Sequence, residues 1–244
     1  MKERIIGHRG AGVLAPENTI EALEKAATLG LSHVEFDVRL TKDHIPVISH
    51  DDSLMRCAHQ NSLISNMNYV DLKDINIAGH FALAAMNAKI PTLEEYLGKA
   101  KELGLHCQIE LKPNKGDEFL LPEIVGDVLD TFYADTSNKD LPLITSFAAE
   151  SLKALKSHTY KQFQTGILIK TDTTSLWEDY ATRAQADYIH VHALYLTDDI
   201  ANDIKNKGYK INAYHLNHPE VARKAIERGC EKFTCDIPDI FLKG

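Results

Sequence analysis

The chain has 244 residues, of which 44% are hydrophobic and 25% are charged, and its formal net charge is -8. This length suits one large domain, and the composition is ordinary for a globular protein. The surplus of acidic groups argues against binding to nucleic acid or to an anionic membrane surface, because both are polyanions.

The apolar runs of the chain are short, and none approaches the ~18 residues of a membrane span. A strand pattern begins almost at the first residue and leaves no room for a signal peptide. The four cysteines form no Cys-x-x-Cys pair, which favours free thiols in a reducing compartment. The sequence therefore predicts a cytoplasmic protein without stable membrane association, and it leaves open whether the chain forms a homo-oligomer.

One unit recurs along the chain: an apolar, β-branched run, a helix cap signal, a helical pattern, and often a glycine before the next run. Alternating strands and helices imply a parallel sheet with right-handed crossovers. Because there are eight such runs, we predict a closed (β/α)8 barrel, the TIM-barrel fold, in a single domain over residues 1–244. The predicted strands are Ile5–His8, His33–Val38, Cys107–Leu111, Leu141–Ser146, Gln164–Ile169, Tyr188–His192, Lys210–Tyr214 and Glu231–Cys235.

Two helix starts carry a cap signal. Asn18-Thr-Ile-Glu21 has the form of a capping box with Asn18 in the cap position, and Thr92-Leu-Glu-Glu95 repeats the pattern. We expect the two helices to run to Gly30 and Gly104. The role expected for Asn18 is to cap its helix and hold the first loop.

The run Pro46–Ser49 does not fit the count of parallel strands. It follows its predecessor too closely for a crossover helix, so we expect it to pair antiparallel, as a hairpin. Residues 52–90 contain no clear strand–helix unit. They are expected to form an insertion over the catalytic face and not a second domain with its own core.

Carboxylates gather where the predicted strands end, which is where barrels of this type carry their chemistry. Glu35 and Asp37 stand two residues apart on one strand, so they project to the same face. Two like charges at such a short separation repel each other unless a cation or a proton lies between them. Glu110 closes another strand, and carboxylate oxygens suit Mg²⁺ or Ca²⁺ better than zinc.

Histidines and cationic side chains fall at the same end of the predicted barrel. His8 and Arg9 close the first strand, and Lys112 follows the strand that carries Glu110. His50 ends the hairpin and would lie near a metal if the hairpin folds back, which would place acid–base chemistry beside a Lewis acid. Arg9 and Lys112 suit an anionic, phosphate-like ligand.

The chain resembles the glycerophosphodiester phosphodiesterase family, in its short cytoplasmic bacterial form. The resemblance extends over essentially the whole chain, because the family's motifs stand in order. They are His8-Arg9-Gly10, Pro16-Glu-Asn-Thr19, Glu35-x-Asp37, Asp43-x-x-Pro-Val-x-x-His-Asp51, Ile90-Pro-Thr-Leu-Glu-Glu95, Glu110-Leu-Lys112, Ser146-Phe147, Tyr214-His-Leu-Asn217 and Asp236-Ile-Pro238.

The resemblance implies a function and a set of roles. The substrate would be a small-molecule glycerophosphodiester, hydrolysed to glycerol 3-phosphate and an alcohol. The metal, Mg²⁺ or Ca²⁺, would bind a phosphoryl oxygen and an adjacent hydroxyl. The implied metal ligands are Glu35, Asp37 and Glu110, the acid–base pair is His8 and His50, and the substrate-binding residues are Arg9, Lys112 and Tyr214.

Two routes and two rival functions remain open at this point. The glycerol 2-hydroxyl can attack first and give a cyclic phosphate that water opens, or water can attack directly. A catalytically inactive phosphodiester-binding barrel would be expected to lose one of the charged or imidazole groups, yet all are present. Mg²⁺-dependent, enolase-like carbon chemistry would need a lysine base on a later strand, and no obvious candidate stands there.

The departures from the family pattern fall on the pocket wall. Tyr214-His-Leu-Asn217 stands where the family has Trp-Thr-Val-Asn, so the tryptophan is lost. This change leaves the predicted chemistry intact and bears on substrate preference. His190 and His192 share a strand face at metal-ligand spacing, but no third ligand is evident, and we interpret both as structural.

Overall fold

The computed structural model describes residues 2–81 and 87–242. Eight parallel strands form a closed ring in the order β1-β9-β8-β7-β6-β5-β4-β2, and the pairing of β1 with β2 completes it. The ring strands are β1 (Ile5–Gly7), β2 (His33–Leu40), β4 (His106–Leu111), β5 (Leu143–Ser146), β6 (Thr165–Ile169), β7 (Tyr188–His192), β8 (Lys210–Tyr214) and β9 (Cys230–Cys235). The predicted (β/α)8 barrel is confirmed.

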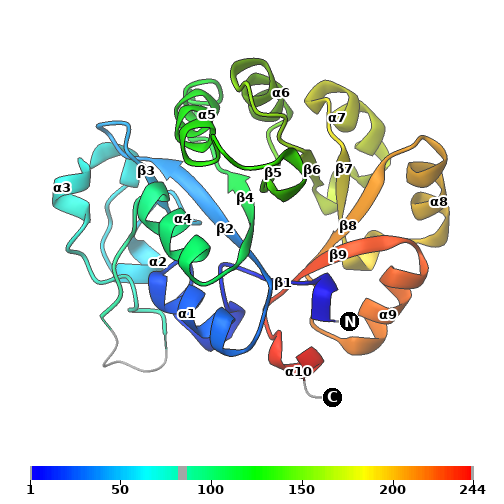
Figure 1. Ribbon diagram of the computed structural model, residues 1–244, viewed down its shortest axis with the longest axis horizontal. Helices are drawn as coiled ribbons and strands as arrows, with labels where there is room; N and C mark the ends of the chain where they lie inside the picture. Colours follow the sequence, from blue (N-terminus) through cyan, green and yellow to red (C-terminus); the bar gives the residue numbers. More distant parts are fainter. Residues whose placement is uncertain (1, 82–86, 243–244) are drawn as a thin grey trace.

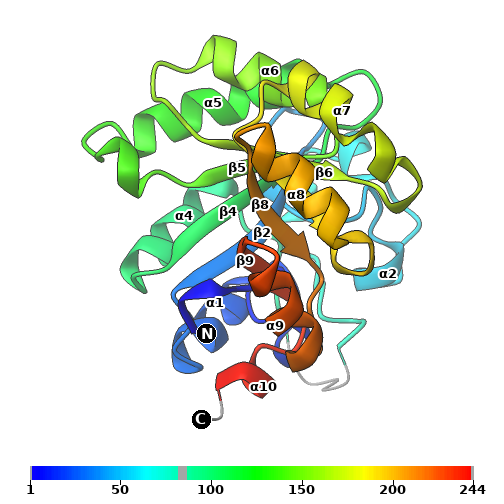
Figure 2. The ribbon, with the colours of Figure 1, turned by 90° about the vertical axis from the view of Figure 1, so that its right-hand side faces the viewer.

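Helices surround the strands, as Figures 1 and 2 show from two sides. The helix that starts at Thr92 has the predicted capping box. Thr92 accepts a hydrogen bond from the backbone N–H of Glu95, and the Glu95 carboxylate accepts one from the backbone N–H of Thr92. The longer helices are α1 (Ile20–Thr28), α4 (Leu93–Glu102), α5 (Leu120–Phe132), α6 (Ala149–His158), α7 (Trp177–Ala184), α8 (Asp198–Asn206) and α9 (Pro219–Glu227), and a short α10 (Asp239–Leu242) follows β9.

Helix α1 is capped by Thr19 and not by Asn18. The Thr19 hydroxyl accepts a hydrogen bond from the backbone N–H of Ala22. Asn18 has a φ of 58°, and its side-chain amide donates to the Asp37 carboxylate over 2.8 Å. The predicted cap role of Asn18 is wrong, because its amide lies beside a buried carboxylate and forms a charge-assisted hydrogen bond there.

The predicted hairpin is present. Strand β3 (Pro46–Ile48) pairs antiparallel with β2, outside the ring of parallel strands. The following segment holds α2 (Met55–Ala58) and α3 (Tyr69–Leu72) and lies at the β3 edge, beside α4 (Figure 1). Within it, residues 82–86 are outside the described residues. A small apolar cluster, separate from that of the barrel, contains Val47, Leu54, Ile64, Leu72, Ile77 and Ile90. The division of the chain into one barrel domain with an insertion stays a prediction.

Side-chain alternation along β2 separates the core from the site. Phe36 is fully buried and its ring packs on Tyr96 of α4, with centroids 4.6 Å apart. Burial of a side chain of this size stabilises the fold by about 1.5–3 kcal/mol. Because successive strand residues point to opposite faces, the neighbours Glu35 and Asp37 point into the barrel. The packing of β2 on α4 therefore fixes where the two carboxylates lie.

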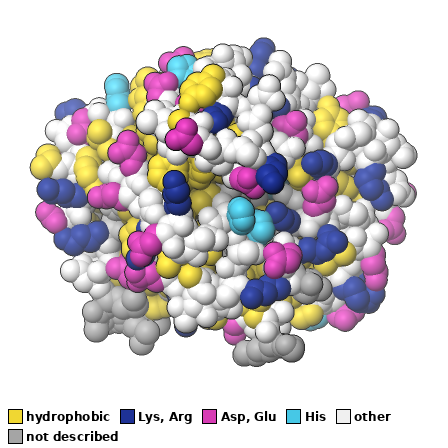
Figure 3. Space-filling model, viewed as in Figure 1, with side chains coloured by type: hydrophobic (Ala, Val, Ile, Leu, Met, Phe, Trp, Pro, Cys, Tyr) yellow, Lys and Arg dark blue, Asp and Glu magenta, His cyan; other side chains and the backbone are white. Residues whose placement is uncertain are grey.

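The helices and the surface charges bear on contact with membranes and with charged partners. Within residues 2–81 and 87–242, each helix is too short or too polar to cross a lipid bilayer. Acidic and basic side chains are interspersed over the face drawn in Figure 3.

Candidate active site

Three buried carboxylates meet at the carboxyl ends of β2 and β4. Strand register places Asp37 directly opposite Glu110, and Glu35 precedes Asp37 on the same face. One oxygen from each of the three lies within 4.8 Å of the others. The structure thus brings together the three residues that the sequence analysis named as metal ligands.

Basic groups border this carboxylate cluster. Lys112 Nζ lies 2.8 Å from a Glu110 oxygen and 3.4 Å from an Asp37 oxygen, and the backbone N–H of Arg9 donates to Glu35 over 3.0 Å. Burial and the negative charge of Asp37 raise the pKa of Glu35 above its ordinary value. Burial opposes ionisation of Asp37 too, but Lys112, with further nearby cations, lowers the pKa of Asp37. Burial also raises the pKa of Glu110, although Lys112 opposes the shift.

The chemistry of the cluster fits a divalent cation. The Oε1 atom of Glu35 and the Oδ1 atom of Asp37 are buried and accept no hydrogen bond. Lys112 Nζ lies 3.4 Å from the Asp37 oxygen without a hydrogen bond. A buried acceptor without a hydrogen bond is costly, and a divalent cation would satisfy both oxygens. Hard carboxylate oxygens are the ligands of Mg²⁺ and Ca²⁺. The residues present therefore suit such an ion, without selecting one of the two.

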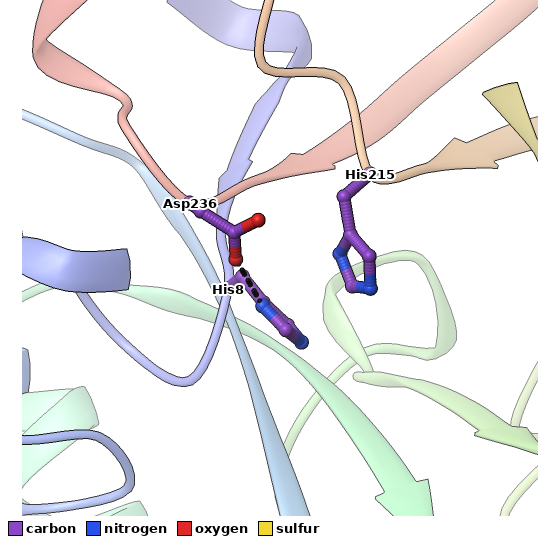
Figure 4. A group of neighbouring side chains, drawn as sticks. All are labelled: His8, His215 and Asp236. Carbon is purple, nitrogen blue, oxygen red and sulfur yellow. Dashed lines mark hydrogen bonds and ion pairs between the residues drawn. The ribbon is translucent and has the colours of Figure 1, made fainter. Parts of the chain in front are cut away.

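His8 forms a hydrogen-bonded pair with a carboxylate from the last barrel strand (Figure 4). The distance from His8 Nδ1 to Asp236 Oδ1 is 2.5 Å, and the ring of His215 lies beside His8, with centroids 4.0 Å apart. Asn217 fixes Asp236 by donating to its carboxylate over 2.7 Å and accepting from its backbone N–H over 2.8 Å. The direct contact between His8 and Asp236 makes this group a hydrogen-bonded imidazole–carboxylate pair.

His50 is held in the same way from the hairpin. Its Nδ1 lies 2.7 Å from an Asp51 oxygen, and the other Asp51 oxygen accepts from Arg56 over 2.7 Å. Arg56 is anchored in turn by two hydrogen bonds to Glu17. In both histidines a carboxylate on Nδ1 leaves Nε2 as the ring atom that can exchange a proton with a ligand.

The pKa values of the two histidines shift in opposite directions. Burial lowers the pKa of His8, but the hydrogen bond to Asp236 and the charge of Glu35 outweigh it, so that the pKa rises above the ordinary value. Burial lowers the pKa of His50, and the charge of Asp37 offsets only part of this effect. Two titratable groups with pKa values moved apart are the pattern of an acid–base pair.

The predicted residues surround a small cavity of about 170 Å³. Tyr214 lies in the wall of this cavity. Its hydroxyl donates to the Ile169 carbonyl over 2.6 Å, so the ring is the part of the side chain that is left to contact a ligand. A cleft of about 620 Å³ shares His8, Arg9 and His215 with this cavity and opens it toward Phe81. The small cavity is lined by His8, Arg9, Glu35, His50, Glu110, Lys112 and Tyr214, while Asp37 lies behind Lys112.

Sequence reasoning missed the groups that hold the histidines in place. Asp236 and Asn217 were recognised in motifs but given no partner, and His215 was treated only as a departure from the family pattern. A signal for Asp236 was available, since the barrel must pair its first strand with its last, with Gly7 opposite Cys235. The residue after β9 then lies beside the residue after β1. His190 is buried in the barrel away from the carboxylates, with Asn212 as its polar neighbour, as a structural histidine would be.

A closed parallel barrel with acidic, basic and imidazole groups at the carboxyl ends of its strands is the architecture of a TIM-barrel enzyme. The model of the glycerophosphoryl diester phosphodiesterase family matches residues 8–240, and the chain belongs to this family. The enzyme class and family expected from the motifs are confirmed.

Three similar proteins extend over nearly the whole chain. A phosphodiesterase of Oleispira antarctica, solved in complex with the product sn-glycerol 3-phosphate, is 29% identical, with a TM-score of 0.86 over 97% of this chain and 94% of that one. A glycerophosphodiester phosphodiesterase structure from Thermotoga maritima is 26% identical, with a TM-score of 0.73 over 98% and 97% of the two chains. A glycerophosphodiester phosphodiesterase of Caldanaerobacter subterraneus is 24% identical over 242 residues, 99% of this chain and 97% of that one.

Proposed function

We propose that the chain hydrolyses glycerophosphodiesters to glycerol 3-phosphate and an alcohol, using a divalent metal held by Glu35, Asp37 and Glu110. The observation that carries the proposal is the meeting of two histidine–carboxylate pairs with a buried cluster of three carboxylates at one barrel mouth. Family membership supports the reaction type, and the product in the Oleispira relative supports the glycerol phosphate half of the substrate.

The cationic side chains hold the phosphate in this scheme. Arg9 and Lys112 both line the small cavity, where guanidinium and ammonium groups form charge-assisted hydrogen bonds to phosphate oxygens. When bound, a divalent metal would add further positive charge against the charge that develops on a phosphoryl oxygen. The contacts of Lys112 with Glu110 and Asp37 keep its ammonium group beside the carboxylate cluster.

The histidines transfer the protons. Asp236 orients His8 and Asp51 orients His50, so that each Nε2 is available to the cavity. One imidazole takes the proton of the nucleophile and the other protonates the leaving alcohol. The nucleophile is either the glycerol 2-hydroxyl, which gives a cyclic phosphate that water then opens, or water itself. Phosphorus NMR during turnover distinguishes the routes, because only the first forms the cyclic ester.

The geometry disfavours the two rival functions. An inactive binding barrel has no need of two histidines each fixed by its own carboxylate. Enolase-like chemistry requires a lysine base, and among the described residues Lys112 is the one lysine that lines the small cavity. Lys112 contacts Glu110 and Asp37, which suits charge neutralisation.

The test is incubation of the purified chain with glycerophosphocholine and Mg²⁺ or Ca²⁺, followed by enzymatic detection of glycerol 3-phosphate. Release that stops with a chelator and is lost in His50→Ala would support the proposal, since the variant controls for a contaminating phosphodiesterase. If glycerophosphocholine, glycerophosphoethanolamine and glycerophosphoglycerol all stay intact with either metal, the hydrolase proposal fails and a binding role is favoured.

A further inference from the structure

A second cavity, of about 300 Å³, lies at the end of the barrel opposite the candidate active site. Its wall includes His33 and His106, which begin β2 and β4, and Lys232, near the start of β9. This end of a TIM barrel ordinarily serves stability through packed side chains. A polar cavity of this size, at the lower end of volumes usual for small-molecule sites, therefore calls for a physical account.

The cavity collects positive charge without matching negative charge. Lys232 Nζ lies 2.7 Å from His33 Nε2, and the His33 ring stacks on His106 with centroids 5.1 Å apart. Lys139 joins the wall from the loop before β5. Within the described part of the chain, neither Lys139 nor Lys232 forms an ion pair with a carboxylate. Two ammonium groups thus share a cavity without a direct ion pair, although the charges of Glu231 and Glu3 partly offset the lowering of the Lys232 pKa by burial.

One acidic group on the same wall offsets part of this charge. Glu231 is the one carboxylate among the described lining residues, and it accepts a hydrogen bond from the hydroxyl of Tyr188 over 3.0 Å. Lys210 also donates to that hydroxyl, from outside the lining. With two lysines against one carboxylate, the described lining residues carry a net positive charge.

One buried polar group of the wall requires a hydrogen-bond donor. Gln108 is only 4% exposed, and its side-chain oxygen has no hydrogen-bond partner. A buried oxygen without a hydrogen bond is costly, and a ligand hydroxyl would supply the missing donor. Asn212 differs, since its oxygen already accepts from the backbone N–H of Lys232 over 3.0 Å. Cationic groups and a free acceptor therefore lie in one small enclosure.

We propose that this cavity is a second ligand site, which binds a small polyol phosphate. The phosphate would lie between Lys139 and Lys232, and a hydroxyl of the polyol would donate to the side-chain oxygen of Gln108. Gln108 also lines the active-site cavity and stands two residues before Glu110 on β4. An occupant of the second site would therefore contact a side chain that borders both cavities. This inference does not depend on the proposed hydrolysis.

The test is calorimetric titration of the full chain with sn-glycerol 3-phosphate, inorganic phosphate and glycerol as separate probes. In the unmodified chain we expect two binding events for glycerol 3-phosphate, of which Lys112→Met removes the one in the active-site cavity. Lys232→Met and Lys139→Met should each weaken the other event by roughly tenfold or more, since each removes a charge-assisted contact. The matched control is Lys153→Met, an exposed lysine of α6, which should leave both events unchanged.

Amide NMR spectra locate the second event independently of its heat. Probe binding in Lys112→Met should shift signals of residues around His33 and His106 more than those around His8. Inorganic phosphate should bind more weakly than glycerol 3-phosphate, and glycerol most weakly. One binding event in the unmodified chain, loss of both events in Lys112→Met, or two unchanged events in Lys139→Met and Lys232→Met would overturn the proposal. Lys139 is exposed, so its variant keeps the test valid even if Lys232→Met fails to fold.

Discussion

His8 and Asp236 are separated by 228 residues in sequence, yet His8 Nδ1 and Asp236 Oδ1 are 2.5 Å apart. The carboxylate accepts the Nδ1 hydrogen and so selects the tautomer and orientation of the ring. Asn217 holds the carboxylate in turn, through two hydrogen bonds. In the proposed mechanism Asp236 is therefore a positioning residue, which acts on the reaction through His8.

Asp236→Asn should lower kcat by roughly 10–100-fold, because the amide no longer selects the productive tautomer of His8. KM should change less than kcat, since Asp236 does not hold the phosphate. The measurement is steady-state kinetics on glycerophosphocholine, with Asp199→Asn on the exposed surface of α8 as the matched control. A kcat equal to that of the unmodified chain would show that Asp236 has no positioning role.

His8→Ala and His50→Ala should each lower kcat by roughly 10²–10⁴-fold, the usual contribution of a general acid or base. Metal affinity should change little, because neither ring belongs to the carboxylate cluster. A substrate with p-nitrophenol as leaving group needs no protonation, so it should partly rescue the variant that lacks the acid. Full activity in either variant would remove that histidine from the mechanism. Equal rescue of both variants would contradict the assignment of one histidine as the acid and the other as the base.

A chelator should abolish turnover, and Mg²⁺, Mn²⁺ or Ca²⁺ should restore it, because the carboxylate cluster offers hard oxygen ligands. Glu35→Gln should weaken metal binding and leave the fold intact, since it relieves repulsion with Asp37. Calorimetric titration measures the metal affinity, and circular dichroism checks that the fold is intact. Glu94→Gln on the surface of α4 serves as the control. Persistent activity in protein shown by elemental analysis to be free of metal would refute the assignment.

His190 should make the folded chain sensitive to acid. It is 1% exposed, and burial lowers its pKa to about 3. A histidine of the unfolded chain titrates near pH 6.5, so below that pH the unfolded state binds a proton that the folded state does not. Stability is therefore lost as the pH falls below 6.5, by about 2 kcal/mol between pH 7 and pH 5 for this group.

His190→Gln should remove that part of the loss in the free energy of unfolding, measured by urea denaturation at both pH values. His218→Gln, at an exposed histidine, controls for the general effect of removing an imidazole. An identical pH dependence in His190→Gln and the unmodified chain would mean that the buried ring does not contribute.

Water-soluble glycerophosphodiesters should be cleaved far better than lysophospholipids. The cleft beside the small cavity is lined by the charged and imidazole side chains of Glu17, His80 and Asp236, which suit a polar headgroup, although Val13, Ala15 and Phe81 also line it. The comparison of kcat/KM for glycerophosphocholine and lysophosphatidylcholine decides the point, and a preference for the lipid would reverse it. Tyr214→Trp, which enlarges a side chain of the cavity wall, should reduce activity on the bulkier headgroups first.

The fold could be predicted because its signals are local. Each apolar run became a strand within two residues of its expected bounds, and the deviations have simple causes. The strand expected from Leu141 begins at Leu143, since Pro142 has no N–H to donate to a ladder. The capping box at Thr92 was equally local. The role of Asn18 was predicted wrongly because its partner, the buried carboxylate of Asp37, lies on another element and is distant in the sequence.

The candidate site could be predicted as a set of residues but not as a network. Strand ends placed the carboxylates, His8 and the two cationic groups at one mouth, because barrel geometry fixes that end. Pairing is different, since any of several carboxylates could have met each imidazole. Asp236 reaches His8 through barrel closure, and Arg56 reaches Glu17 through the fold of the insertion. Such contacts depend on tertiary structure, which no spacing along the chain reports.

Closure of the barrel between β1 and β9 has a consequence for synthesis on the ribosome. His8 leaves the exit tunnel 228 residues before Asp236, so the orientation of His8 must await the synthesis of β9 and the residue after it. Pairing of the first strand with the last is among the most distant contacts that the chain can make, and contacts of this kind slow folding. Until they form, the open edges of β1 and β2 are exposed to pairing with other nascent chains. The hydrogen bond that orients His8 thus cannot form until β9 has been made and has closed the barrel.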